Sequence, residues 1–179
     1  MEIVDIETLS KSQLTQAAQM LTDEIPLGWK TFDEAMRELN DLLSDEEASL
    51  IAALDDGKVI GWCGIFPHYG GNVFELHPLV VRHDWQRKGV GTALMDAVTN
   101  IAREKGGLTM WIGADDEKPG GETSFANADL YDDLPKQMRE YEPGTHQTAF
   151  YLKLGFKIVG VMPDANGIGK PDIYLAKRL

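Results

Sequence analysis

The chain has 179 residues, of which 43% are apolar and 26% charged, which suits one ordinary globular domain over residues 1–179. Its formal net charge of −12 argues against nucleic acid as a partner and favours a cationic small molecule, although acidic charge can also serve solubility alone. Neither a membrane helix nor a signal peptide is indicated, and the single cysteine, Cys63, excludes a disulfide framework. We therefore expect a cytoplasmic protein with no membrane partner.

The first half of the chain predicts an antiparallel meander and two helices. Thr31 and Glu34 have the spacing of a capping box at the start of an apolar stripe. The segment Asp55-Asp56-Gly57-Lys58 is a strong hairpin signal between two apolar runs. In chain order we expect a strand at Glu2–Ile6, helices around Leu14–Leu21 and Thr31–Leu43, and strands at Leu50–Leu54, Val59–Phe66 and Val73–Val81.

The second half predicts a helix from Thr92 to the Gly106-Gly107 pair, then a strand at Leu108–Ile112. If this helix is a crossover, the strand runs parallel to the one before it. Residues 114–145 are polar and acidic, and so long an excursion is often functional. This segment includes a short helix around Leu134–Glu140. A helix at Thr148–Leu154 and strands at Phe156–Val161 and Asp172–Ala176 follow it. The order indicates an α/β (α+β) fold, a mixed sheet with helices on both faces.

The most informative motif is a basic glycine turn between a strand and a helix. Glycines let a ligand approach the backbone, and the first N–H groups of a helix have no helical partner, so such a turn can bind phosphate. Two basic residues of the turn add positive charge. The alternative is an ordinary tight turn, since the spacing fits neither the P-loop nor the dinucleotide fingerprint. The turn comprises Arg87, Lys88, Gly89, Val90, Gly91 and Thr92.

In this context the Gln-x-x-Gly-x-Gly pattern from Gln86 to Gly91 resembles the acetyl-CoA pyrophosphate loop of the GNAT N-acetyltransferases. Longer blocks after residue 65 resemble the aminoglycoside 6′-N-acetyltransferases, whereas the N-terminal third matches only in layout. These blocks include Phe74–Val81, Gly106–Thr109, Gly113–Asp116, Asp129–Tyr131, Phe150–Val161, Asn166-Gly167 and Lys170–Ile173.

The resemblance implies a mostly antiparallel central sheet, a parallel β-α-β cofactor unit, acetyl-CoA as cofactor and a homodimer. It also implies that the Leu79 N–H polarises the thioester carbonyl, while Val80 and Val81 line the pantetheine arm. Tyr151 would protonate the departing thiolate or hold its sulfur in place, although a buried tyrosine with no such role is the alternative. Pro78 indicates a sheet edge or a bulge, since proline cannot donate to a ladder.

Acetylation of an amine needs a proton acceptor, because a free alkyl amine has a pKa of roughly 10 and must lose a proton. Strand alternation places Glu75, His77, Leu79 and Val81 on one face. Glu75 is the preferred base or water-orienting group, with a surface ion-pair partner as the alternative. His77 either relays a proton or only fills a half-buried strand position.

Substrate contacts are predicted at Asp115 and Asp116, which follow a strand and could bind an ammonium, and at Trp29 and Tyr69, which could stack on a sugar ring. Each has a structural alternative: the acidic pair could simply begin a solvated loop, and either aromatic could belong to the core. Cys63 is rejected as an acetyl carrier, because it lies in an apolar strand with no identified base. The four histidines show no zinc spacing, so no metal is predicted.

The leading hypothesis is direct acetyl transfer from acetyl-CoA to the 6′-amine of an aminoglycoside. A second keeps the chemistry but makes the acceptor a polyamine, another small amine or a protein lysine. The third is a non-catalytic acyl-CoA-binding domain that retains the fold. The natural acceptor, any part in antibiotic resistance and the oligomeric state lie beyond what the residues themselves indicate.

Overall fold

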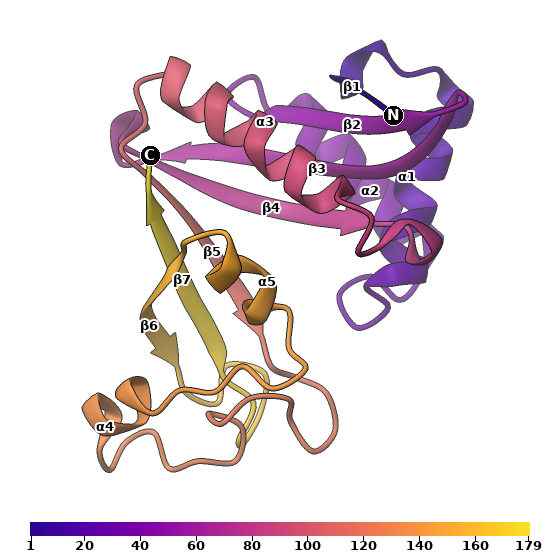
Figure 1. The fold of residues 1–179 in the computed structure, drawn as a ribbon. Helices are drawn as coiled ribbons and strands as arrows, with labels where there is room; N and C mark the ends of the chain where they lie inside the picture. Colours follow the sequence, from indigo (N-terminus) through magenta and orange to yellow (C-terminus); the bar gives the residue numbers. More distant parts are fainter. The chain divides into compact units, whose positions relative to one another are not determined.

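The computed structural model describes all 179 residues, which form two compact units, Met1–Met110 with Leu179 and Trp111–Arg178 (Figure 1). The architecture is mixed α/β: seven strands, mostly antiparallel with one parallel pair, together with helices. This confirms the expected fold class, while one domain over residues 1–179 remains a prediction. None of the helices has the length and apolarity needed to cross a bilayer.

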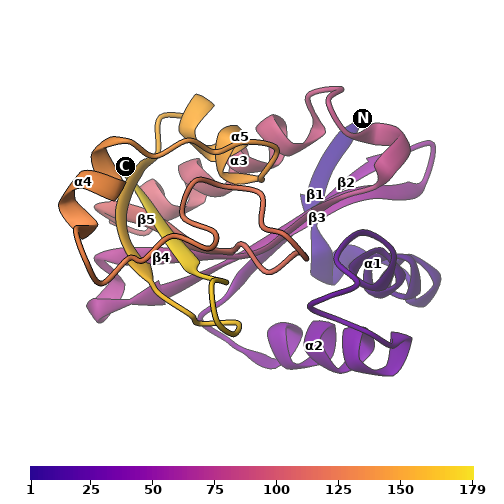
Figure 2. The ribbon, with the colours of Figure 1, turned by 90° about the horizontal axis from the view of Figure 1, so that it is seen from below.

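In the first unit, four strands are hydrogen-bonded in chain order, each antiparallel to the next. Helix α3 lies on one face of these strands, and α1 and α2 lie on the other (Figure 2). The elements are β1 (Glu2–Asp5), α1 (Lys11–Glu24), α2 (Phe32–Ser44), β2 (Ser49–Asp55), β3 (Lys58–His68), β4 (Val73–Val81) and α3 (Val90–Glu104).

Capping boxes begin both helices on the lower face in Figure 2. Ser10 and Gln13 form one before α1, and Thr31 and Glu34 form the predicted one before α2. Each satisfies backbone N–H groups that the first turn of a helix leaves without a partner. Trp62 of β3 is fully buried and donates its indole N–H to a carbonyl of α1, that of Ala17, at 2.9 Å. The sheet and α1 are therefore joined by a buried hydrogen bond as well as by apolar contact.

A bulge interrupts β4 at Pro78, which is one of the two features, a sheet edge or a bulge, that the sequence indicated there. Cys63 pairs with Leu79 and Ile65 pairs with Leu76, so β4 uses one residue more than β3 between these pairs. The extra residue lies opposite Gly64, where a Cβ atom would stand 2.7 Å from the carbonyl oxygen of His77. A glycine at this position lets the bulged strand approach its neighbour.

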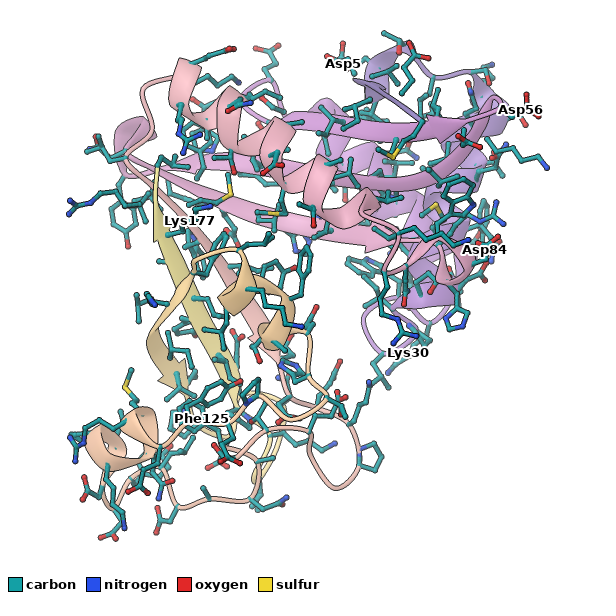
Figure 3. The ribbon with its side chains drawn as sticks, viewed as in Figure 1. Asp5, Lys30, Asp56, Asp84, Phe125 and Lys177 are labelled. Atoms are coloured by element: carbon teal, nitrogen blue, oxygen red, sulfur yellow. The ribbon has the colours of Figure 1, made fainter.

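The second unit contains strands in the order β5, β7, β6, with β6 and β7 antiparallel. Phe125 of its long polar segment, labelled in Figure 3, is buried, and the centroid of its ring lies 4.6 Å from that of the Tyr141 ring. The elements are β5 (Thr109–Asp115), α4 (Leu134–Arg139), α5 (Thr148–Lys153), β6 (Lys157–Met162) and β7 (Asp172–Arg178).

The predicted elements all exist, and most of the differences lie at their ends. Helix α3 begins at Val90, two residues before the predicted start, because Gly89 takes the left-handed conformation and forms the N-cap. Short 3₁₀ turns at Ile6–Thr8, Tyr69–Gly71 and His83–Trp85 were not predicted. Such turns leave little periodic signal in a sequence, since each is one turn long.

Candidate active site

One face of β4 presents the residues expected to carry the chemistry. Burial alternates along the strand, so that Glu75, His77, Leu79 and Val81 are half-buried while the residues between them are buried. The predicted face is therefore confirmed, and it persists through the bulge. The intervening Val80 belongs to the hydrophobic core, so only its backbone is available for the role expected of it.

Glu75 and His77 line a hollow of about 350 Å³ in the first unit. Three carboxylates border this hollow, those of Asp45, Glu47 and Glu75. Such a concentration of negative charge in a concave surface attracts a cation. The remaining lining residues are Leu42, Phe66, Pro67 and His68.

Two carboxylate–imidazole pairs lie at this site. The Nε2 atom of His68 is 2.7 Å from the Oε2 atom of Glu75, and the Nε2 atom of His77 is 3.3 Å from the Oε1 atom of Glu38. No motif in the sequence indicated Glu38 or the pairing of His68 with Glu75. Helix α2 brings Glu38 to a strand 39 residues away in the chain, a contact for which the local sequence holds no signal.

The two aromatic residues predicted to bind substrate have different surroundings. Trp29 is half-buried, donates its indole N–H to Glu38 Oε2 at 3.4 Å, and has its ring centroid 5.8 Å from that of His77. Tyr69 is 81% exposed and does not line the hollow. Trp29 therefore contacts Glu38 and His77, whereas Tyr69 lies on the surface.

The glycine turn lies at the start of α3, where the sequence predicts an anion cradle. Gly89 has φ of +88° and offers no capping side chain, and the first helical bond runs from Ala93 N–H to Gly89 O. The N–H groups of Val90, Gly91 and Thr92 therefore have no partner within the helix. Together with the partial positive charge of the helix N-terminus, they fit a phosphate group.

Side chains around the turn hold it in place. The amide nitrogen of Gln86 donates to Val81 O at the end of β4 and to the carboxylate of Glu24 in α1. Arg87 and Lys88 are exposed, and the Lys88 ammonium lies 5.3 Å from the centre of the Trp85 ring. The turn therefore presents exposed positive charge, and the side chain of the preceding Gln86 is hydrogen-bonded to the end of the sheet.

The acidic pair of the second unit separates into two environments. Asp116 is fully buried, and its carboxylate accepts the backbone N–H groups of Glu122 and Thr123. Because these bonds occupy it inside the protein, we do not retain Asp116 as a substrate ligand. Asp115 is exposed and accepts a hydrogen bond from the side-chain amide of Asn166. Of the two aspartates, only Asp115 remains a predicted substrate ligand.

Tyr151 lies on α5 and is 2% exposed. The centroid of its ring lies 5.2 Å from that of Phe150 and 5.7 Å from that of Phe156. Its predicted role at the departing sulfur stays a prediction. Cys63 is fully buried, and burial raises the pKa of its thiol. A thiol held in this form is a poor nucleophile, in keeping with its rejection as an acetyl carrier.

The model of the acetyltransferase (GNAT) family matches residues 14–119. An aminoglycoside 6′-N-acetyltransferase solved in complex with coenzyme A is 32% identical to this chain over 99% of it and 97% of that chain, with a TM-score of 0.92. The aminoglycoside 6′-N-acetyltransferase from Enterococcus faecium is also 32% identical over the same shares, with a TM-score of 0.89. No curated protein sequence matches significantly. The chain thus belongs to the GNAT family and is an acetyl-CoA-dependent N-acetyltransferase.

Proposed function

We propose that the protein acetylates a primary amine of an aminoglycoside, with the 6′-amine as the acceptor. The observation that carries the proposal is the hollow bordered by Asp45, Glu47 and Glu75, whose negative charge suits a polycationic sugar. The similarity over 99% of the chain to proteins described as aminoglycoside 6′-N-acetyltransferases supports this acceptor.

In this proposal Glu75 assists removal of a proton from the bound ammonium, directly or through a water molecule. The neutral nitrogen then forms the bond to the acetyl carbon. His68 stands 2.7 Å from the Glu75 carboxylate and holds it toward the hollow that both residues line. A general base of this kind accelerates a reaction by roughly 100- to 10,000-fold.

The backbone N–H groups from Gly89 to Thr92 would hold the pyrophosphate, with Arg87 and Lys88 adding positive charge. Acetyl-CoA supplies the acetyl group as a thioester and leaves as the free thiol. We propose that the Leu79 N–H stabilises the negative charge that develops on the carbonyl oxygen, a contribution of roughly 3 kcal/mol for one such donor. Tyr151 is proposed to provide the proton, or the hydrogen bond, that the sulfur requires.

The base assignment is tested with Glu75→Gln, which keeps the shape of the side chain and removes its basicity. We expect kcat to fall about 100-fold, while the KM for acetyl-CoA stays unchanged. The control is Glu46→Gln, because Glu46 lies between Asp45 and Glu47 in the chain but is exposed and does not line the hollow. An unaltered kcat in Glu75→Gln contradicts the assignment.

The acceptor class is tested by measuring thiol release from acetyl-CoA across a panel of amines. Release with kanamycin-type compounds supports the proposal, and release only with polyamines, other small amines or lysine peptides moves the acceptor to those classes. Binding of acetyl-CoA without release for any amine points to a non-catalytic domain. We further propose a homodimer, which sedimentation of the purified protein tests directly.

A further inference from the structure

Glu38 is a carboxylate that contacts two predicted site residues, Trp29 and His77, and has no role in the proposed function. It projects from α2, and both of its oxygens are engaged. Oε1 lies 3.3 Å from Nε2 of His77, and Oε2 lies 3.4 Å from the indole nitrogen of Trp29. The rings of Trp29 and His77 also contact each other, so the three side chains form a closed triangle.

The position of Glu38 is fixed by the core. Its neighbour Leu39 is fully buried, as is Ala35 one turn earlier, and the Thr31 capping box fixes the start of the helix. Helix α2 therefore cannot turn about its axis without exposing apolar surface. The Glu38 side chain is only 31% exposed, and this partial desolvation strengthens its hydrogen bonds relative to those in water.

The chemistry of the pair determines which nitrogen of His77 carries a hydrogen. A carboxylate accepts hydrogen bonds and donates none, so Nε2 of His77 must be the donor. In the neutral imidazole, Nδ1 is then the basic nitrogen. Trp29 donates to the second oxygen of Glu38, which restrains the carboxylate in the orientation that meets His77.

We propose that Glu38 is a positioning residue that holds His77 as the Nε2–H tautomer and makes Nδ1 a proton acceptor for the amine. This inference rests on the proposed acetylation of an amine. The N–H bond of the ammonium breaks, a proton joins Nδ1, and the resulting imidazolium is stabilised by the Glu38 carboxylate. Glu75, which is paired with His68, assists this transfer through a water molecule in the hollow that Glu75 and His77 both line, and Nδ1 of His77 then holds the proton.

The test is Glu38→Gln, which preserves size and lets an amide N–H face His77 in place of a carboxylate oxygen. We expect the neutral His77 to change to the Nδ1–H tautomer, which ¹⁵N chemical shifts recorded at alkaline pH distinguish from the Nε2–H tautomer. We also expect kcat to fall at least about tenfold with little change in the KM for acetyl-CoA. The matched control is Asp41→Asn, which removes one charge from an exposed position on the same helix.

Several results would overturn the proposal. The Nδ1–H tautomer in the unmodified protein refutes it without any variant, and so does an unchanged kcat in Glu38→Gln. A raised KM for the amine with unchanged kcat would mean that Glu38 acts only through its charge on the substrate. If no amine is acetylated, the proposed function and the proton-acceptor role fail, whereas the tautomer measurement still decides whether Glu38 orients His77.

Discussion

Gly64→Ala tests whether the bulge in β4 depends on a missing side chain. The new Cβ would stand 2.7 Å from the carbonyl oxygen of His77 and 2.7 Å from Cδ2 of Leu50, closer than real Cβ atoms approach. The carbonyl belongs to the bulged backbone, so it cannot move without shifting His77 and Pro78. Overpacking of a core by one methyl group costs about 1–3 kcal/mol.

Thermal unfolding followed by circular dichroism measures the stability cost. A loss of about 2 kcal/mol lowers the Tm of a chain this long by roughly 4–8 °C. We also expect kcat to fall, because the displaced strand carries both Glu75 and His77. The control is Gly160→Ala on β6, whose Cβ would lie 3.4 Å from Tyr174 in ordinary contact. Equal Tm and kcat in Gly64→Ala and the unmodified protein would refute this account of the bulge.

Three further outcomes are expected. Gly89→Ala should raise the KM for acetyl-CoA severalfold in steady-state kinetics, because alanine at φ of +88° costs about 1 kcal/mol; an unchanged KM counts against the anion cradle. Cys63 should resist thiol reagents until the protein unfolds, since it is fully buried, and Cys63→Ala should retain turnover. Burial raises the pKa of Tyr141, so its contribution to stability is complete below the unfolded pKa of about 10 and is lost as pH rises through the folded pKa; Tyr141→Phe should reduce that alkaline loss in urea unfolding.

Much of the fold could be predicted because its signals are local. The capping box at Thr31 and Glu34 marks the start of α2, and the hairpin at Asp55–Lys58 joins β2 to β3. Period-two alternation along β4 placed Glu75 and His77 on one face, where the structure has them. Pro78 indicated a sheet edge or a bulge, because it has no N–H group to donate, and the strand pairing shows that it is a bulge.

The site could be predicted only in part, because its pairings join distant segments. The strand supplied Glu75 and His77, but their partners His68 and Glu38 come from other elements. Asp116 illustrates the opposite error, since an acidic residue after a strand suggested ligand binding while the loop uses it for its own N–H groups. A residue's type gives its possible bonds, and packing decides which of them form.

The sequence by itself therefore determined the order of the elements, the glycine turn, the chemistry-bearing face of β4 and the family resemblance. These depend on residues close together in the chain, whose backbone preferences and periodicity act before any long-range contact. The tertiary structure alone decided that Glu38 meets His77, that Asp116 is buried and that Tyr69 stays exposed. Such contacts are set by the packing of α2, the loops and the sheet, which no local pattern encodes.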